Sequence, residues 1–367
     1  MRMADLTPEL AGKRLAKTIF LEDGRALLRA GVVLTTSYIQ ELQKRGYTYV
    51  YVENELAPDV VIEDAINEET RIKTSALLKK VVLQSLNDKQ MDFAPVEEAV
   101  ELIIEELQGN SSTVYNLSTI RNVDNYTYEH SVNVAVLAII LGSSIHMSFR
   151  DLKTLGTGAI LHDLGKAFIP EVITKPDRLT PQEMEVMKTH TWLGYNHLRN
   201  STEISLLAAH VALQHHEKLD GSGYPRGLRG NEILDYARVV AVADVYDAVS
   251  TDRVYRPRLH PNEVAQLMTE MSGSHLDGDL VQRLFRHVAI YPTGSIVLLD
   301  TGEIGVVVEQ TKDVKDPIIR IVTDAEQNLI EPYQFRLASE KKTVKRILRD
   351  YPHKVNQQIQ KRQKAQG

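Results

Sequence analysis

The sequence predicts a mainly α-helical protein, with a helical bundle as its central domain between a small N-terminal α/β module and a small C-terminal β module. Helical periodicity prevails from about residue 70 to 287. Short β-branched runs with turn signals follow after about residue 290, and residues 14–52 mix strand and helix patterns. A length of 367 residues with 43% apolar residues favours two or three domains with substantial cores.

The N-terminal module is expected to span residues 1–55. Its pattern predicts a hairpin that turns at Asp23-Gly24, a helix around residues 37–45 and a strand at 47–52. Residues 53–69 are rich in acids and contain no basic residue, which is typical of a solvated connector. We assign residues 56–109 to this connector and to amphipathic helices, which could relay a signal but more often simply pack.

The central domain is expected over residues 110–290. Thr180 precedes Pro181, and Glu183 follows three positions after Thr180, which together indicate a capping box with proline at the first helical position. A helix is therefore predicted to begin near residue 181 and to contain His190 about two and a half turns later.

The C-terminal β module is expected over residues 291–340, where runs such as "SIVLLDTGEIGVVVEQ" alternate with turn signals. The tail, residues 341–367, has nine Lys and Arg residues against one acid, Asp350. We expect a solvated, frayed helix there in preference to a binding patch. Sensing, partner binding, a folding cap and a dimer surface all remain open as roles for the terminal modules.

The composition excludes several classes of site. The chain has no cysteine, so it has no disulfide, CxxC zinc site, iron–sulfur cluster or thiol nucleophile. A net charge of −6 gives no global reason to expect a DNA or RNA polymer as partner. The start lacks an apolar h-region and no run of 18 apolar residues occurs, so we expect no export, no membrane partner and a cytoplasmic location.

Metal-type ligands recur inside apolar segments. Asp244 lies in "VVAVADV", where an unpaired carboxylate is costly to bury, and a bound metal is the most economical explanation. Single histidines are more often satisfied core or surface residues, but here an HD pair, a single His, an HH pair and an Asp follow in order. The candidate ligands are His130, His162, Asp163, His190, His215, His216 and Asp244. Such ligands suit Fe, Mn, Zn, Ni or Co.

Adjacent residues on a helix point about 100° apart, so His162 and Asp163 cannot duplicate one another, and a carboxylate with two oxygens can bridge two ions. His215 and His216 need a helix end or turn to converge, which the glycines after them allow. Lys166 follows Asp163 by three residues. By spacing alone it is equally a helix-capping surface lysine or a cation that faces a phosphate beside the metals.

The order of these residues resembles the HD-GYP family, phosphodiesterases of the bacterial messenger cyclic di-GMP. The match covers about residues 110–290, and "HHEKLDGSGYP" at 215–225 is highly specific to the family. The resemblance implies an HD-type helical bundle with a di- or trinuclear centre, commonly of iron or manganese. One ion would be held by His130, His162, Asp163 and Asp244, and the second by His190, His215 and His216, with Asp163 bridging.

The resemblance also implies catalytic roles for Asp163 and Lys166, the latter as a phosphate contact. The expected substrate-side residues are Lys166, Asp220, Gly221, Gly223, Tyr224, Pro225, Asp247, Arg253 and Arg256. Members with three metals have a Glu four residues before the first ligand histidine, where this chain has Tyr126. Tyrosine is a poor substitute for a carboxylate ligand, so we expect a binuclear centre.

The expected function is hydrolysis of cyclic di-GMP to linear pGpG by a hydroxide that bridges two metal ions, with onward cleavage to GMP left open. One alternative is a non-catalytic cyclic di-GMP receptor or scaffold that signals through its terminal modules. A homodimer and a signalling-protein partner both remain open. Another is an HD hydrolase for a different nucleotide, including a mixed GMP–AMP ring.

Overall fold

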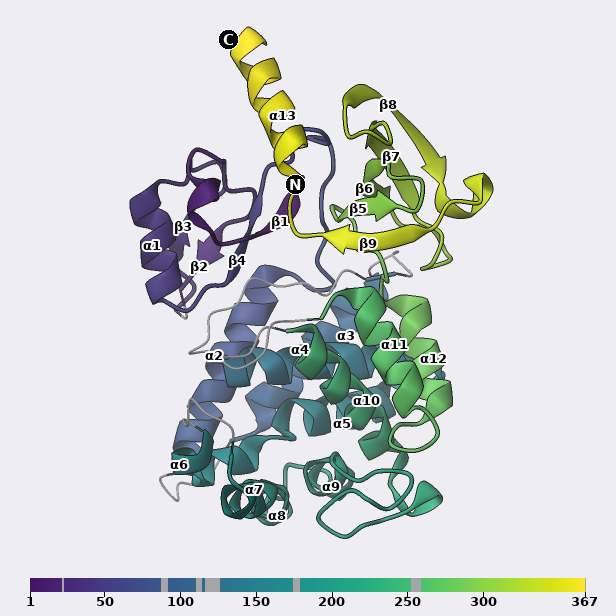
Figure 1. The fold of residues 1–367 in the computed structure, drawn as a ribbon. Helices are drawn as coiled ribbons and strands as arrows, with labels where there is room; N and C mark the ends of the chain where they lie inside the picture. Colours follow the sequence, from purple (N-terminus) through teal and green to yellow (C-terminus); the bar gives the residue numbers. More distant parts are fainter. Residues whose placement is uncertain are drawn as a thin grey trace.

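The computed structural model describes residues 1–21, 23–86, 92–109, 114–115, 126–173, 179–251 and 259–366. Within these ranges a helical bundle forms one end of the molecule, and both small modules lie together at the other end (Figure 1). The predicted fold class is confirmed. No helix in the described part of the chain is both long and apolar enough to cross a membrane.

The N-terminal module contains two small antiparallel sheets and one helix. Strand β1 (Arg2–Asp5) pairs with β4 (Tyr49–Val52), and β2 (Ile19–Phe20) pairs with β3 (Ala26–Leu28). A 3₁₀ turn, η1 (Pro8–Leu10), follows β1, and helix α1 (Thr36–Lys44) begins after a side-chain cap. The predicted hairpin, helix and last strand are all present.

The bundle is built around α4 (Tyr126–Ser144), whose residues 130–142 are all buried. This helix packs against α5 (Phe149–Leu161), α10 (Asp235–Ser250) and α2 (Glu68–Ser85), and therefore reads as apolar on every face. The other helices are α3 (Ala94–Gly109), α6 (Pro170–Ile173), α7 (Pro181–Lys188), α8 (His190–Leu198), α9 (Leu206–Gln214), α11 (Pro261–Met271), α12 (Gly278–His287) and the short η2 (Leu164–Phe168) and η3 (Gly230–Glu232).

The helix expected from residue 181 begins as predicted but is shorter. The capping box of Thr180 and Glu183 is present, yet α7 ends at Lys188 and His190 opens the next helix. The Thr189 hydroxyl donates to the Val186 carbonyl oxygen at 2.6 Å, which satisfies one of the terminal carbonyls of α7. The prediction that one continuous helix contains His190 was therefore wrong.

The C-terminal module is one antiparallel sheet of order β8-β7-β6-β5-β9. Its strands are β5 (Ile296–Leu299), β6 (Ile304–Glu309), β7 (Ile318–Thr323), β8 (Leu329–Arg336) and β9 (Val344–Leu348), with η4 (Leu337–Glu340) before β9 and α13 (His353–Gln366) after it.

The basic tail differs from the expected solvated helix. Strand β9 lies within it and pairs with β5, and α13 buries Val355 and Ile359 in a cluster with Ala57 and Val60 of the connector. The apolar positions recur at helical spacing, which a count of charges does not reveal. Contacts therefore cross the expected boundaries at 55 and 340, and the division of the chain into five parts remains a proposal.

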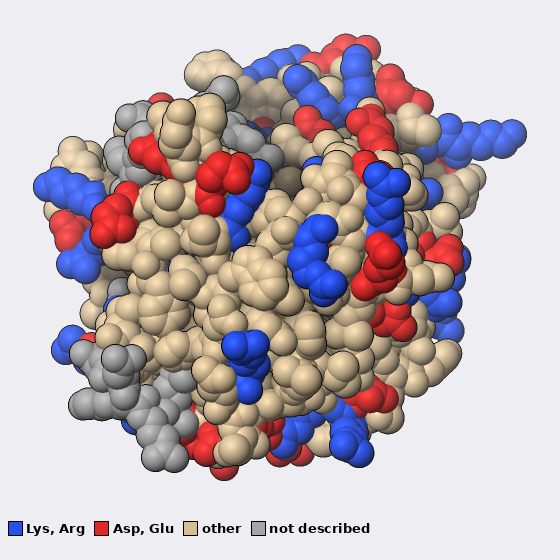
Figure 2. Space-filling view, turned by 90° about the horizontal axis from the view of Figure 1, so that it is seen from below, with Lys and Arg blue, Asp and Glu red and all other residues tan. Residues whose placement is uncertain are grey.

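Figure 2 views the molecule from the bundle end, where α7, α8 and α9 lie in Figure 1. Lys and Arg side chains on this face are interspersed with Asp and Glu around a largely uncharged centre. Exposed apolar side chains of these helices include Met184, Val186 and Trp192. The visible described residues thus form no broad basic surface of the kind that attracts nucleic-acid polymers.

Candidate metal centre

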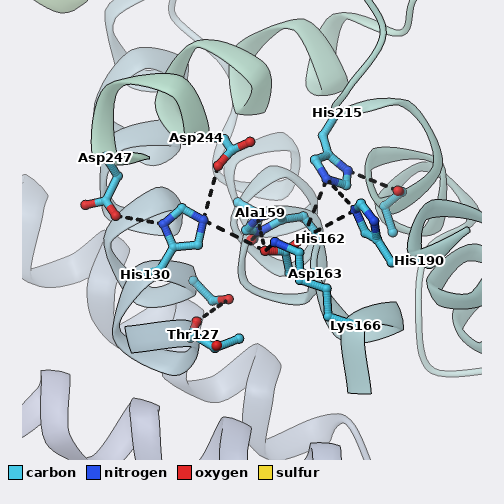
Figure 3. A network of polar contacts seen from close by, with 12 residues as sticks. Thr127, His130, Ala159, His162, Asp163, Lys166, His190, His215, Asp244 and Asp247 are labelled. Atoms are coloured by element: carbon cyan, nitrogen blue, oxygen red, sulfur yellow. Dashed lines mark hydrogen bonds and ion pairs between the residues drawn. The ribbon is translucent and has the colours of Figure 1, made fainter. Parts of the chain in front are cut away.

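Side chains from facing helices of the bundle converge on one interior site (Figure 3). His130 comes from α4, His162 and Asp163 from the end of α5, His190 from the start of α8, and Asp244 from α10. The ligand-type atoms form two groups, each within 4.8 Å of one another: one of Asp163, His190, His215 and His216, the other of His130, His162 and Asp244. All seven sequence-predicted ligands are thus brought together.

Gly165 explains why the end of α5 can approach the start of α8. A Cβ atom at this position would lie 1.9 Å from the carbonyl oxygen of His190, so only glycine allows this approach. The close contact places Asp163 beside the ring of His190. Local backbone geometry therefore assembles the first of the two groups.

Three histidines have the same orientation. His162, His190 and His215 each direct Nδ1 at the carbonyl oxygen three residues earlier, at 2.6, 2.6 and 3.0 Å. A carbonyl only accepts, so Nδ1 carries the hydrogen and, in the neutral ring, Nε2 presents a lone pair to the site. This is the arrangement that proteins use to orient metal-binding histidines.

His130 is oriented by a carboxylate instead. Its Nδ1 donates to Asp247 Oδ2 at 2.7 Å, and its Nε2 lies 3.1 Å from Asp244 Oδ1 and 3.9 Å from Asp163 Oδ2. Burial lowers the pKa of His130, but the hydrogen bonds to both aspartates outweigh it and raise that pKa to about 9. A cation, here a proton, is thus favoured between His130 and Asp244, where a metal ion could replace it.

Asp163 faces both groups. Its Oδ1 lies 3.5 Å from His190 Nε2 and 3.7 Å from His215 Nε2, while its Oδ2 lies 3.3 Å from His162 Nε2. Lys166 also pairs with Oδ2. Burial alone would raise the pKa of Asp163, but the interactions with His162 and Lys166 lower it well below its usual range, so the carboxylate is ionised.

The donor set fits divalent transition metals. Burial lowers the pKa of His190 to about 4 and that of His216 to about 3, and it also lowers the pKa of His215 well below its usual value. These rings are therefore neutral at pH 7. His162 Nε2 and Asp163 Oδ1 are buried and hydrogen-bond to no described residue. Unsatisfied imidazole nitrogens and a buried carboxylate are the ligands that such metals take.

The loop after His216 is shaped by two glycines and one buried acid. Gly221 has a φ of +80°, and a Cβ atom on Gly223 would lie 2.4 Å from the backbone nitrogen of Lys218. Glu217 is buried, and its two carboxylate oxygens accept the backbone N–H groups of Arg226 and Leu228 at 2.8 and 2.9 Å. These contacts fold the loop back over the histidine pair.

Tyr224 lies beside the second group of ligands. Its ring centroid is 4.7 Å from that of His216 and 6.4 Å from that of His190, and its peptide bond to Pro225 is cis. Burial raises the pKa of Tyr224, so its hydroxyl stays protonated and can donate a hydrogen bond. The loop thus places the aromatic ring of Tyr224 next to the candidate metal ligands.

The remaining substrate-side residues are placed differently from one another. The Asp220 carboxylate is directed into its own turn and accepts the N–H of Ser222 at 2.8 Å. Asp247 is buried, and its Oδ2 accepts from His130 Nδ1 at 2.7 Å, so its carboxylate faces a candidate ligand, and its expected contact with the substrate stays a prediction. Arg253, Arg256 and the side chain of Tyr126 lie outside the described residues.

Sequence reasoning overlooked two residues whose contacts support the candidate site. Glu217 was noticed only as part of the motif, and Asn133, which donates to Asp247 Oδ1 at 3.0 Å, was not considered. The spacing offered a signal for the contacts of Asn133 and Asp247. Asn133 follows His130 by three residues and Asp247 follows Asp244 by three, so each pair shares one helix face.

Comparisons with known proteins agree with this geometry. A family model described as HD domain matches residues 113–280. A cyclic di-GMP phosphodiesterase of Pseudomonas aeruginosa is 33% identical over 276 residues, which are 72% of this chain and 66% of that protein. The 3'3'-cGAMP-specific phosphodiesterase 2 of Vibrio cholerae is 30% identical over 193 residues, 52% of this chain and 37% of that protein.

Among solved structures, an HDG"Y"P protein from Bdellovibrio bacteriovorus aligns with a TM-score of 0.51 and 18% identity, over 77% of this chain and 97% of that one. This likeness bears on the fold alone. The chain spans two thirds or less of the length of the two curated relatives. The HD-domain match and the curated relatives therefore place this chain among HD-domain proteins, and its loop from His215 to Pro225 has the HD-GYP sequence pattern.

Proposed function

We propose that this chain is a metal-dependent phosphodiesterase that opens one phosphodiester of cyclic di-GMP to give linear pGpG. The observation that supports it most is the placement of Asp163, whose two oxygens face different groups of histidine Nε2 atoms. A carboxylate so placed suits a bridge between two ions. The Pseudomonas relative is a cyclic di-GMP phosphodiesterase by name, which supports the choice of substrate.

The ions, when bound, would supply Lewis acidity and an acidified water for in-line attack at phosphorus. The seven candidate ligand residues would hold them, and Asp247 would fix the ring orientation of His130. Lys166 would stabilise negative charge on the phosphate, since its side chain is 25% exposed beside Asp163. The Tyr224 ring would support a base or ribose, and its protonated hydroxyl would donate to a phosphate oxygen.

Two ions per chain, iron or manganese, are the proposed complement. The ligand groups number two among the described residues, and tyrosine replaces the carboxylate expected at position 126 in members with three metals. Ni, Co and Zn also suit histidine and carboxylate ligands. Elemental analysis of fully loaded protein that returned three ions per chain would overturn this count.

A second candidate substrate is 3'3'-cGAMP, because the Vibrio relative acts on that ring and covers 52% of this chain. Both rings offer the same two phosphodiesters to the site, so the metal centre does not distinguish them. Contacts to the bases would therefore decide between the two substrates.

The test is a time course with purified protein loaded anaerobically with Fe²⁺ or separately with Mn²⁺. Cyclic di-GMP, 3'3'-cGAMP and pGpG are incubated in separate reactions, with chelator-treated protein as the control. We expect pGpG to appear first from cyclic di-GMP, and GMP later if the linear diester is also cleaved. Tight binding of cyclic di-GMP without turnover in both metal forms would instead establish a receptor, and faster cleavage of 3'3'-cGAMP would change the substrate.

A further inference from the structure

A chain of hydrogen bonds connects the metal centre with a helix outside the HD-domain match. Arg71 on α2 is 5% exposed, and its Nη1 donates to Asn133 Oδ1. Asn133 Nδ2 donates to Asp247 Oδ1 at 3.0 Å, and Asp247 Oδ2 accepts from His130 Nδ1 at 2.7 Å. Figure 3 shows the last of these contacts, from Asp247 to His130 and on to Asp244.

The hydrogen bonds of this network run in one direction, because its first member, Arg71, can only donate. A guanidinium has no acceptor, so the Asn133 amide must turn its oxygen toward Arg71 and its nitrogen toward Asp247. The reversed amide would place its oxygen against the Asp247 carboxylate and its NH₂ against the guanidinium. Both contacts would then be repulsive, so Arg71 selects the one amide orientation that supports Asp247.

We propose that Arg71 is a positioning residue of the metal centre. It fixes Asn133, which holds the Asp247 carboxylate, which in turn sets the tautomer and ring orientation of His130. The proposal rests on the ligand role that the proposed function gives to His130. Outer partners of a ligating histidine fix its tautomer and ring orientation, and here one of them, Arg71, precedes the matched region, residues 113–280.

The alternative is a purely structural role. Arg71 is a buried charge, and Glu68 lies 3.7 Å from its Nε with a side chain that is 41% exposed. A buried cation without a close partner is destabilising, so any substitution that removes the charge changes stability in either case. The test therefore needs a measurement that a loss of packing alone would not alter.

The N-terminal module contacts α2 close to Arg71. Ile72, next to Arg71, lies against Gly24 of the β2–β3 hairpin, and Lys17 pairs with Asp64 at 2.6 Å just before the helix. The N-terminal module thus contacts the same turn of α2 that holds Asn133. A shift of this module would reach His130 through Arg71, Asn133 and Asp247, three side chains that are joined by hydrogen bonds.

The experiment is a Co²⁺ titration of the metal-free full chain, followed by the visible absorption of bound Co²⁺, which reports ligand geometry as well as occupancy. We expect Arg71→Leu to weaken one of two Co²⁺ sites by about tenfold and to alter its spectrum, while the other site is unchanged. Arg71→Lys, which keeps a donor-only cation, should restore most of the affinity. Unchanged titration curves for Arg71→Leu would overturn the proposal.

Three further variants separate the outcomes. Leu78→Ala removes a buried apolar side chain from the same helix and should lower stability without changing either Co²⁺ site. An equal change in Leu78→Ala and Arg71→Leu would assign a structural role to Arg71. If Arg71→Leu does not fold, Asn133→Asp serves instead, because its carboxylate still accepts from Arg71 but replaces the amide that donates to Asp247. It should weaken the same site, and unaltered binding would reject the proposal.

His130→Ala distinguishes this inference from the function on which it rests. If His130→Ala loses one Co²⁺ site and Arg71→Leu does not, only the role of Arg71 is wrong. If His130→Ala retains both sites with unchanged affinity, the metal centre itself is wrong.

Discussion

The Nε2 atoms of His190 and His215 lie 3.3 Å apart, and neither has a hydrogen to place between them. Each ring already donates its Nδ1 hydrogen to a backbone carbonyl, and burial lowers both pKa values, that of His190 to about 4. Two lone pairs at this distance repel one another unless a cation lies between them. The fold thus brings together two lone pairs that a bound cation would satisfy.

Metal removal is therefore predicted to destabilise the protein. Binding to the native state alone adds about 2.7 kcal/mol to the free energy of unfolding at a free metal concentration of a hundred times Kd. We expect chelation to lower the thermal midpoint, and added Mn²⁺ to restore it. Differential scanning calorimetry on wild type, His190→Ala and His353→Ala tests this, since His353 lies on α13 and should respond as wild type does. A full Mn²⁺ response in His190→Ala would contradict it.

Asp163→Asn is predicted to reduce kcat by at least about 10³-fold with little change in the stability of the metal-free protein. The amide keeps the volume of the side chain but offers one acceptor, so it cannot serve both histidine groups. Initial rates with cyclic di-GMP measure the effect, and Glu270→Gln on exposed α11 is the matched control. Activity within tenfold of wild type in Asp163→Asn would exclude a bridging role.

The sequence predicted which candidate ligands converge, because they follow a pattern that is independent of their neighbours. His130 and Asp244 could be proposed from residue type, apolar context and order alone. The residues behind them could not. Asp247 was expected to meet the substrate. In the structure α4 and α10 pack so that its carboxylate faces Nδ1 of His130, and nothing in the sequence reveals this packing. Such pairings depend on tertiary packing.

The fold shows the same limit at two places. Local signals predicted the start of α7 correctly, but its end depends on side chains that bond the last carbonyls, and those bonds were not foreseen. The tail was judged by its charge, whereas its burial depends on the free edge of β5 and on Val60 far away in the sequence. The end of α7 thus depends on a local bond, whereas the tail was predicted wrongly because its stability comes from distant partners.

Gly165→Ala is predicted to disrupt the centre from outside the ligand set. The new Cβ atom would overlap the His190 carbonyl oxygen, so η2 and α8 must separate, at a cost of at least about 1–3 kcal/mol. We expect a lower unfolding midpoint in urea and a loss of metal at the Asp163 and His190 group. Gly109→Ala is the control, because no described atom beyond its chain neighbours and its own helix backbone lies within 4 Å of its Cβ position. Equal stability of the two variants would show that the contact can relax.

Glu217→Gln tests whether the loop that contains Tyr224 depends on one buried acid. A glutamine can accept one of the two backbone N–H groups, of Arg226 and Leu228, but turns its NH₂ toward the other. A buried donor left unsatisfied costs about 1–3 kcal/mol. Because the loop is displaced and the metal ligands precede it, we expect KM for the dinucleotide to rise several-fold while metal content stays at the wild-type level.

The control for this variant lies in the same loop. Glu232 also accepts a backbone N–H, that of Arg229 at 2.8 Å, but its side chain is exposed, so water can replace the lost acceptor in Glu232→Gln. Its KM and metal content should match the wild type. If Glu217→Gln and Glu232→Gln have the same KM, burial of Glu217 does not position Tyr224. If Glu217→Gln instead loses metal, the loop supports His215 and His216 directly, and its role is in metal binding.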